Sequence, residues 1–428
     1  MFDIKLIREN PEMVRANVKR RHKPEYLDML DELIENDKKW REAVSELNKL
    51  RQKRNEISLQ IAKLKKDKKD AGKLMKEAEK VPGQIKKLES DVVVLEQKNK
   101  TLLMKFPNII HESVPDGKDE TENVEIRRWG KPPKFDFTPK NHLEILEGLG
   151  MVDIERAAKV SGAGFVYLRG DVVLLDLALQ RFALDFLRKK GFTIIEPPYM
   201  INRRPYEEVV DLSDFESVMY KIDGEDLYLI ATSEHAMGAM FLDDVIDKKD
   251  LPLTLAGISP CFRKEVGSHG KYTKGLFRMH QFNKVEQFIF CLPEESWKWF
   301  EQIQKNAEEL YQQLGIHHRV IEMCTGDLTS IKAKSYDVEG WMADGQFREL
   351  GSCTNCTDYQ ARRLNVKYRE GLGKPPAGFV HTLNNTALAT SRTMLAILEQ
   401  FQQKDGSVKI PKVLVPLMNG IEVLKKKS

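Results

Sequence analysis

The stretch of sequence that decides the fold runs from Phe262 to Glu286 and reads FRKEVGSHGKYTKGLFRMHQFNKVE. Two runs of charged and aromatic residues flank a polar loop with glycines, which is the pattern of a β-hairpin. Side chains two residues apart share one face of a strand, so Arg263 and Glu265 should point the same way. The same period groups Arg278, Phe282 and Glu286. This face would suit phosphates, a purine and an amine. Taken alone, the hairpin could equally be an exposed sheet face with mixed charges and no function.

Helices and strands are expected to alternate around this hairpin. The pattern predicts an amphipathic helix from Asp171 to Lys189 that Gly191 ends, and then a strand from Phe192 to Ile195. Further strands are expected at 228–231, 257–265, 277–290 and 379–383, and further helices at 294–314 and 387–403. Because several of these strands are separated only by short loops, we predict an α+β domain with an antiparallel β-sheet flanked by helices.

A second informative string lies near the end of the chain, where residues 381–392 read HTLNNTALATSR. We expect a strand, a polar turn and the start of a helix. Arg392 would then lie early on that helix, where it could reach a phosphate in front of the sheet.

The segment before this domain has the pattern of a coiled coil. Apolar residues recur every three or four positions from Trp40 to Leu64, if Arg54 is allowed among them, and again from Ile85 to Leu102. A turn rich in Lys and Asp separates the two stretches, so they should fold back as an antiparallel helical hairpin. Pro82 lacks a backbone N–H, and we expect a kink or break in the second helix there.

The charge of the chain is concentrated in this hairpin. The net charge is only +4 over 428 residues, but residues 38–100 hold 19 Lys and Arg against 10 Asp and Glu. A basic cluster near the expected tip suits a phosphate backbone, although a solvated dimerisation or spacer coil remains the alternative. The cluster consists of Lys63, Lys65, Lys66, Lys68, Lys69, Lys73 and Lys76.

Composition excludes several classes of protein. With 41% hydrophobic residues the chain can bury a large core, and no apolar run is long enough for a membrane helix. The start at Met1 lacks the apolar stretch of a signal peptide, and five cysteines are too few and odd in number for a disulfide framework. We therefore expect a cytoplasmic protein that does not bind a membrane. Prolines after Pro107 indicate a connector, and the expected domains are 1–112 and 113–428.

Together these strings resemble the motifs of class II aminoacyl-tRNA synthetases, and in particular the seryl-tRNA synthetase family. Gly191 to Met200 is similar to the first motif, Phe262 to Glu286 to the second, and Asn384 to Arg392 to the third. Two further strings are similar to the seryl branch, Thr232-Ser233-Glu234 and Arg348 to Cys353. The resemblance covers nearly the whole chain and implies a serine–tRNA ligase with an N-terminal helical arm and a class II catalytic domain.

The resemblance implies that Arg263 and Arg392 are catalytic and that the substrates include ATP with Mg²⁺. Arg263 would hold the α-phosphate, while Phe282 and Arg392 would sandwich the adenine. Glu265 would accept from the adenine amino group, and Arg278 and Arg392 would reach the γ-phosphate. Glu349 and Ser352 would hold Mg²⁺. The positions similar to the ATP site of the family are Arg263, Lys264, Glu265, Arg278, Met279, Phe282, Glu349, Leu350, Gly351, Ser352 and Arg392.

The resemblance also implies an L-serine site. Thr232 and Glu234 should share one face of a short strand. Glu286 and Thr386 should hydrogen-bond to the serine hydroxyl, and alanine would be rejected strongly because it would leave a buried acceptor unpaired. The positions similar to the serine site are Thr232, Ser233, Glu234, Arg263, Glu286, Asn384 and Thr386.

The implied partners are tRNA(Ser), bound through the basic arm, and a second copy of the chain in a homodimer. The sequence leaves open whether tRNA(Sec) is also charged. Asn385 stands where the family usually has glycine, and the expected turn should survive because asparagine tolerates positive φ. Cys353 and Cys356 form a single CxxC, too little for a zinc site.

Three other interpretations have to be weighed. A paralogue that activates an amino acid for a carrier protein would lack the arm, and a non-catalytic scaffold should lose Arg263, Glu286, Glu349 or Arg392. A threonine or proline synthetase would carry a further domain after the third motif, where this chain has only 36 residues. Class I synthetases are disfavoured because neither of their signature strings is present.

Overall fold

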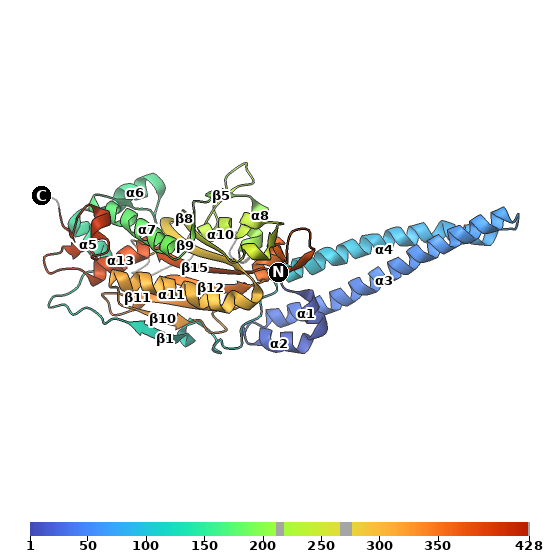
Figure 1. The fold of residues 1–428 in the computed structure, drawn as a ribbon, viewed down its shortest axis with the longest axis horizontal. Helices are drawn as coiled ribbons and strands as arrows, with labels where there is room; N and C mark the ends of the chain where they lie inside the picture. The colour runs from blue at the N-terminus through green and yellow to red at the C-terminus, as the bar shows by residue number, and fades with distance from the viewer. Residues whose placement is uncertain (211–217, 266–275, 427–428) are drawn as a thin grey trace. The chain divides into compact units, whose positions relative to one another are not determined.

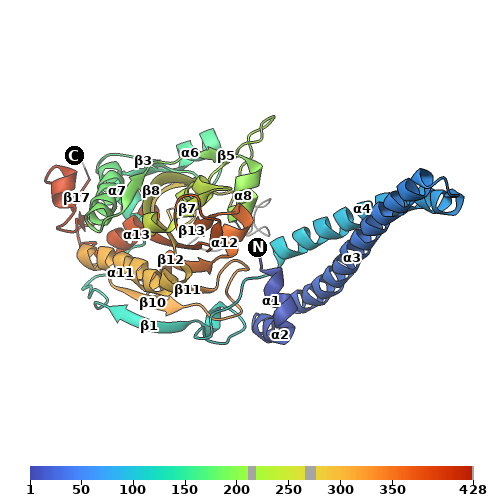
Figure 2. The same ribbon diagram turned by 45° about the vertical axis from the view of Figure 1, so that its right-hand side comes forward.

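The computed structural model describes residues 1–210, 218–265 and 276–426 and divides the chain into two units, Met1–Pro107 and Asn108–Ser428. The first unit is helical. Its helices are α1 (Ile4–Glu9), α2 (Pro11–Lys19), α3 (Glu25–Lys66) and α4 (Gly72–Lys105). The predicted antiparallel helical hairpin is confirmed by α3 and α4, which run side by side in Figures 1 and 2.

The seam of this hairpin is apolar at its centre and polar near its base. Leu47 and Ile57 of α3 are buried against Val81 and Ile85 of α4. The expected break at Pro82 is wrong, because α4 runs unbroken through this residue. Proline removes only one helical hydrogen bond, and the buried residues on either side of Pro82 hold the helix against α3.

A buried polar pair lies in the same seam. The Asn36 amide donates to Asn99 Oδ1 at 2.8 Å and to the Leu95 carbonyl at 3.0 Å. Both asparagines are buried, so each depends on the other to satisfy its hydrogen-bonding groups. A single buried polar pair among apolar residues sets the register of two helices.

The second unit is built on an eight-stranded sheet with the order β1-β10-β11-β12-β15-β9-β8-β4. All neighbours are antiparallel except β4 and β8, which are parallel, so the predicted α+β domain is confirmed. The strands in spatial order are Val124–Trp129, His318–Glu322, Lys334–Trp341, Phe347–Thr357, His381–Ala389, Gln281–Cys291, Leu253–Phe262 and Thr193–Ile195.

Helices and small sheets surround this sheet. The main helices are α5 (His142–Leu149), α6 (Ile154–Ser161), α7 (Asp171–Lys189), α8 (Arg203–Val209), α10 (Ser233–Gly238), α11 (Ser296–Leu314), α12 (Tyr359–Leu364) and α13 (Thr390–Gln400). The short strands are β2 (Val152–Asp153), β3 (Tyr167–Leu168), β5 (Met200–Ile201), β6 (Tyr228–Leu229), β7 (Val245–Asp247), β13 (Lys367–Arg369), β14 (Pro376–Phe379), β16 (Val408–Lys409) and β17 (Val423–Leu424). Among the described residues, no helix is both long and apolar enough to cross a membrane.

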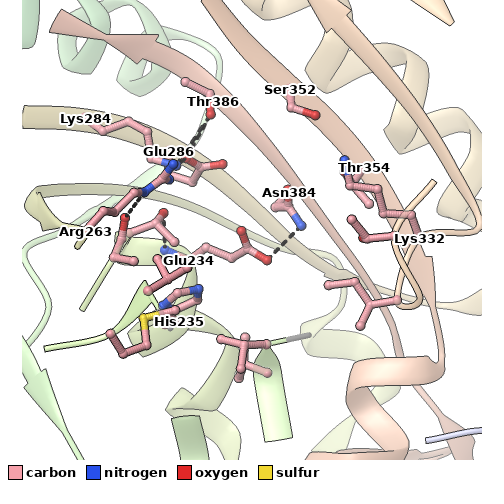
Figure 3. A pocket seen from close by; sticks show the side chains of 18 of the residues that line it. Glu234, His235, Arg263, Lys284, Glu286, Lys332, Ser352, Thr354, Asn384 and Thr386 are labelled. Carbon is pink, nitrogen blue, oxygen red and sulfur yellow. Dashed lines mark hydrogen bonds and ion pairs between the residues drawn. The ribbon is translucent and has the colours of Figure 1, made fainter. Parts of the chain in front are cut away.

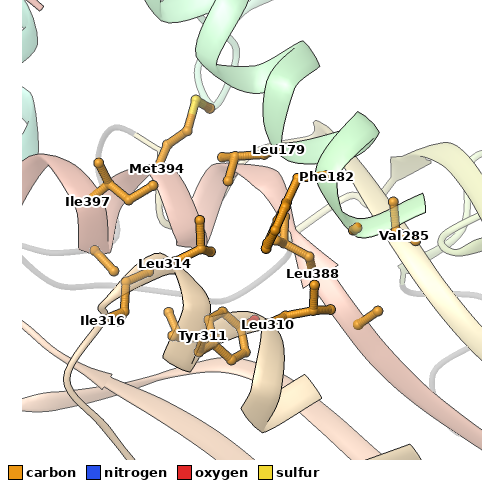
Figure 4. Packing of buried hydrophobic residues seen from close by; sticks show 14 of the residues in the cluster. Leu179, Phe182, Val285, Leu310, Tyr311, Leu314, Ile316, Leu388, Met394 and Ile397 are labelled. Carbon is orange, nitrogen blue, oxygen red and sulfur yellow. The ribbon is translucent and has the colours of Figure 1, made fainter. Parts of the chain in front are cut away.

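The core of the second unit lies between the sheet and three helices. Phe182 of α7, Leu310 of α11 and Ile397 of α13 meet Leu388 of β15 and Val285 of β9 (Figure 4). The helix predicted from Asp171 to Lys189 has these bounds, and Gly191 follows it at φ 90°. Burial of these helices against one face holds the central strands in place.

The string from His381 to Arg392 differs from the expectation of a polar turn. β15 continues to Ala389, and α13 begins only at Thr390. Asn385 lies within the strand, where its amide donates to the Ile303 carbonyl of α11 at 3.1 Å. Because β9 and β12 pair with β15 on both sides, ladder hydrogen bonds outweigh the local turn preference of two asparagines.

The buried asparagine pair of the arm gives a testable expectation. Asn36→Leu should destabilise the helical hairpin by about 1–3 kcal/mol, because the Asn99 carbonyl would stay buried without its donor. Hydrogen exchange of the α3 and α4 amides in the full chain would show faster exchange. The double variant Asn36→Leu/Asn99→Leu should recover most of the loss, and a double variant that exchanges faster than the single one would contradict this account.

Candidate active site

A cavity of about 460 Å³ lies over the sheet, with walls from β9, β12, β15, α10, the end of α8, the residues that follow β8 and the loop between β10 and β11. A smaller cavity of about 40 Å³ adjoins it. Five residues line both, and they mark the junction between the two spaces. These residues are Arg263, Glu265, Lys284, Glu349 and Thr386.

The cavities bring together most of the site residues expected from the sequence. The first is also lined by Thr232, Glu234, Arg278, Glu286, Ser352 and Asn384. The second is also lined by Met279, Phe282, Leu350, Gly351 and Arg392. Residues 150 positions apart in sequence therefore meet at one place, as with Glu234 and Asn384.

Two expected site residues line neither cavity. Ser233 is fully buried, and its hydroxyl donates to the Gly257 carbonyl at 3.3 Å, which fastens α10 to β8. The backbone N–H of Lys264 donates to the Val218 carbonyl at 2.9 Å, and its ammonium group lies over the Tyr220 ring. Both contacts support the walls of the site.

Glu234 comes from a helix, so the expectation of a strand at Thr232 and Glu234 is wrong. Thr232 is the N-cap of α10, and its hydroxyl accepts from the Glu234 N–H at 3.2 Å. The Glu234 carboxylate accepts a hydrogen bond from Asn384 Nδ2 at 2.9 Å (Figure 3) and another from Gln360 Nε2 at 3.3 Å. A capping threonine followed by an acid is typical of a helix start.

The electrostatics of Glu234 are set by its surroundings. Burial of the carboxyl and, second to it, repulsion by Glu286 raise its pKa to about 7. The positive charges of Lys284 and Lys332 and a hydrogen bond donated by Gln360 lower the pKa of Glu234, but by less. Two carboxylates therefore converge in a place where one of them holds a proton near neutral pH.

Glu286 lies at the centre of β9 and is almost fully buried. Its carboxylate forms an ion pair with Lys284 and accepts from the Thr386 hydroxyl at 3.3 Å (Figure 3). The Lys284 ammonium group also lies 3.5 Å from Thr386 Oγ1. The pairing of β9 with β15 sets Glu286 directly opposite Thr386, so strand register creates this cluster.

Guanidinium groups dominate the side toward the smaller cavity. Arg263 stacks over the Phe282 ring at 5.3 Å, and its Nε donates to the Ala231 carbonyl at 3.3 Å. Arg278 pairs with Glu265 at 3.2 Å. These groups lie just beyond the paired ends of β8 and β9, so the predicted hairpin face is assembled partly outside the strands.

Arg392, on the first turn of α13, contacts Glu349 twice. Its Nη1 lies 2.9 Å from the Glu349 carboxylate and donates to the Glu349 carbonyl at 3.1 Å. The guanidinium group also lies 5.0 Å over the Phe277 ring. The charge of Arg392 lowers the pKa of Glu349 below its usual value. The expected early helix position of Arg392 is confirmed.

The residues present at β12 fit a hard divalent cation. Glu349 supplies a carboxylate and Ser352 a hydroxyl, and Asp337 lies opposite Ser352 on β11 with its Oδ1 making no hydrogen bond. In the described part of the chain, no three His, Cys, Asp or Glu side chains cluster as a dedicated metal cage. Magnesium commonly takes one or two protein carboxylates and completes its coordination with substrate phosphates and water, which matches this donor set.

Three ionisable residues that line the cavities were not predicted as site residues from the sequence, namely Lys284, Lys332 and His235. Lys284 lies between Phe282 and Glu286 at the period-two spacing, so the strand pattern could have found it. Lys332 enters from the loop between β10 and β11, where no periodicity applies, and lies across the cavity from Arg263 in Figure 3. His235 follows Glu234 and packs against the Tyr206 ring.

The basic cluster of the arm lies where the sequence predicted, at the tip of the hairpin. The cluster spans the last turn of α3, the connecting turn and the start of α4. All of its members are exposed, namely Lys63, Lys65, Lys66, Lys68, Lys69, Lys73 and Lys76. Lysines in the last turn of α3 also complement the negative end of the helix dipole.

Comparisons with known proteins agree over the whole chain. The family model of the seryl-tRNA synthetase N-terminal domain matches residues 1–110, and that of the class II tRNA synthetase core domain (G, H, P, S and T) matches residues 217–401. A protein of Methanocella arvoryzae named serine–tRNA ligase is 54% identical over 99% of this chain and 100% of its own length.

Two solved structures are also similar. Seryl-tRNA synthetase from Pyrococcus horikoshii complexed with ATP has 47% identity and a TM-score of 0.97, with 100% of each chain covered. Cytoplasmic serine–tRNA ligase from Naegleria fowleri in complex with AMP has 36% identity and a TM-score of 0.92 over 100% of this chain and 99% of that one.

A glycine in the wall of the smaller cavity gives a prediction about the packing of β12 against β15. A Cβ at Gly351 would lie 2.9 Å from Thr386 Cβ and 3.1 Å from the Thr386 carbonyl oxygen. Gly351→Ala should therefore push β12 from β15 and destabilise the chain by about 1–3 kcal/mol in urea unfolding. Gly148→Ala in α5 is the matched control, because nothing lies within 4 Å of its Cβ and alanine favours helix. Equal stability of the two variants would contradict the close approach.

Proposed function

We propose that this chain, which belongs to the seryl-tRNA synthetase family, activates L-serine with ATP in the two adjoining cavities and transfers the seryl group to tRNA(Ser). One observation carries the placement of serine. Glu234 and Glu286 converge beside Lys284, and their mutual repulsion helps to raise the pKa of Glu234 to about 7. An α-ammonium group supplies the positive charge that this pair of acids favours.

The serine hydroxyl would meet Glu286 and Thr386, which already hydrogen-bond to each other at 3.3 Å. A substrate without the hydroxyl would leave these buried groups incompletely paired, so alanine should be rejected strongly. Asn384, Thr232 and Glu234 would hold the ammonium group, and Arg263 would hold the carboxylate.

ATP would occupy the side lined by the three arginines. Arg263 would bind the α-phosphate, Glu265 would accept from the adenine amino group, and Phe282 with Arg392 would stack on the adenine. The ion pairs Arg278–Glu265 and Arg392–Glu349 hold both guanidinium groups at the cavity wall, from which they would reach the γ-phosphate. Lys264, Met279, Leu350 and Gly351 would contribute through the backbone and the walls. Glu349 and Ser352 would hold Mg²⁺, which neutralises phosphate charge when it is bound.

The chemistry requires no nucleophile from the protein. An oxygen of the serine carboxylate attacks the α-phosphorus, the bond to the bridging oxygen breaks, and pyrophosphate leaves with the electron pair. Arg263 and Arg392 stabilise the charge that develops on the phosphoryl oxygens, and the site holds the reacting atoms in line. In the second step the terminal 3′-hydroxyl of tRNA attacks the activated carbonyl and AMP leaves.

A division of labour follows from this proposal. The arm domain, 1–112, would bind the tRNA backbone through its basic tip, and the catalytic domain, 113–428, would carry out both chemical steps in the cytoplasm. Whether tRNA(Sec) is a second substrate depends on backbone recognition by the same lysines.

The chain would act as a homodimer through the segment Gly191 to Met200. An apolar groove of about 500 Å³ runs beside this segment, and the Met200 and Met240 side chains at its edge are 45% and 54% exposed. Exposed apolar surface of this kind is typical of a subunit interface. The mass of the protein in solution tests this part of the proposal.

Serine activation should depend on pH through Glu234. Below about pH 7 this carboxyl is increasingly protonated, so the KM for serine in ATP–pyrophosphate exchange should rise on the order of tenfold per pH unit. Burial raises this pKa most, Glu286 raises it further, and Lys284, Gln360 and Lys332 lower it, while Asn384 donates a hydrogen bond to the same carboxylate. Above pH 7 the KM should be flat, and the KM for ATP is the internal control.

The Glu234→Gln variant serves as the matched control. It should bind serine weakly at every pH and lose the inflection near pH 7. A wild-type KM for serine that stays constant from pH 6 to pH 8 would remove Glu234 from the ammonium site. Exchange with an amino acid other than serine would contradict the proposed substrate.

The basic tip should act only in the transfer step. Replacing its seven lysines by glutamine should weaken charging of tRNA(Ser) and reduce the slope of log affinity against log salt by about 0.7–0.9 for each phosphate that the lysines no longer neutralise. Pyrophosphate exchange without tRNA should not change. Lys298→Gln/Lys305→Gln, at exposed positions on α11, is the control. Unchanged charging would make the arm a spacer, and tRNA(Sec) assayed in parallel shows whether both substrates use the same lysines.

A further inference from the structure

We propose that Lys284 is a catalytic residue of serine activation, which exchanges its carboxylate partner Glu286 for the reacting oxygens when serine binds. The inference rests on the proposed function, because it places serine in the larger cavity and ATP on the side of the smaller one. It adds a basic residue to the chemistry that neither the motif pattern nor the comparisons assign.

The position of Lys284 supports this role. The serine carboxylate and the α-phosphate must meet where the two cavities join, because the new bond forms between them. Among the described residues that line both cavities, the basic ones are Arg263 and Lys284. Lys284 thus stands beside the point of reaction and next to Glu286 (Figure 3), on the strand that also carries Phe282.

The present partners of Lys284 are fixed by the sheet. Its ammonium group forms an ion pair with Glu286 and lies 3.5 Å from Thr386 Oγ1. The side chains of Lys284 and Glu286 are only 7% and 1% exposed. A buried charge needs a counter-charge, and removing one partner of such a pair is costly, so neither group can simply lose the other.

Serine brings both replacement partners at once. Its ammonium group, placed between Glu234 and Glu286, also gives Glu286 a new cation, and its carboxylate gives Lys284 a new anion. The exchange gives Lys284 and Glu286 each a new partner of opposite charge, which a neutral or singly charged ligand would not do. An amino acid is therefore the kind of ligand that releases Lys284 toward the nucleotide.

Lys284 then acts by charge alone. The ammonium group has three N–H donors and can contact the serine carboxylate together with a non-bridging oxygen of the α-phosphate. As the carboxylate oxygen attacks and the bond to pyrophosphate breaks, Lys284 holds the two anionic groups together and stabilises the charge on the phosphoryl oxygens. No proton is transferred, and the lysine is unchanged at the end of the step.

The alternative role for Lys284 is structural, in which it only neutralises Glu286. The two roles separate in kinetics, because a residue that acts in the transition state changes kcat, whereas one that only prepares the serine pocket changes KM for serine. They also separate by step, because transfer from a finished seryl-adenylate does not involve attack on phosphorus.

The test compares Lys284→Met and Lys284→Arg in the full chain. In pyrophosphate exchange, Lys284→Met should lower kcat on the order of 100-fold, as loss of an electrostatic catalytic group does. Single-turnover transfer of serine from chemically synthesised seryl-adenylate to tRNA(Ser) should fall less than tenfold. Lys284→Arg keeps the charge and should recover at least a tenth of the wild-type kcat. Lys305→Met, an exposed residue on α11, controls for the loss of a lysine.

Each other outcome overturns a defined part of the account. An unchanged kcat with a raised KM for serine would make Lys284 a positioning residue for Glu286 and would end the proposal, as would equal losses in exchange and transfer. If Lys284→Met does not fold, the test rests on Lys284→Arg alone. A reduced rate of pyrophosphate exchange with a wild-type rate of transfer to tRNA(Ser) would support the proposal. Equal losses in the two rates would contradict it. Wild-type protein that shows no serine-dependent exchange would overturn the proposed function itself.

Discussion

The register of β9 between β8 and β15 is the constraint on which the rest of the structure depends. This pairing sets Glu286 opposite Gly257 on one side and Thr386 on the other. Because Gly257 has no side chain, α10 can pack closely there, and an added Cβ would lie 2.7 Å from Ser233 Oγ and 2.6 Å from Met237 Cε. That close approach brings Glu234 to the same cavity as Glu286. A shift of one residue in the register of β9 would turn Lys284 and Glu286 to the opposite face of the sheet and separate them from Thr386.

The cavity carries a cost in stability that points to function. Its acids and bases occur mostly as pairs, and a buried pair seldom stabilises a protein more than apolar residues of similar volume would. Glu234 shows the electrostatic cost of a buried carboxylate most clearly, because burial and the charge of Glu286 raise its pKa to about 7. Buried charges of this kind are found mainly at functional sites, and the ammonium group of the proposed substrate, serine, would supply the positive charge that the two acids favour.

Much of the fold and part of the site could be predicted from the sequence. Strand period placed Phe282 and Glu286 on one face correctly, and the heptad pattern predicted the arm, because both depend on simple repeats. Prediction failed where packing overrides local preference. Asn385 looked like a turn residue but lies in a strand whose neighbours pair on both sides, and Pro82 looked like a helix break but lies between buried contacts with α3. Lys332 reaches the cavity from a loop, for which no periodic signal exists.

In the proposed function, the serine site and the ATP site share a wall, and this would limit how far either site can change without the other. Thr386 hydrogen-bonds to Glu286 on the side proposed for serine, and its side chain lies against Gly351 on the side proposed for ATP. A larger residue at Gly351 would move Thr386, and a changed Thr386 would disturb the pairing of Glu286 with Lys284. Cores transmit such shifts because they are densely packed. In the proposed function, recognition of the hydroxyl and alignment of the α-phosphate would therefore be coupled through one threonine, so a pocket for another amino acid would require changes on both β12 and β15.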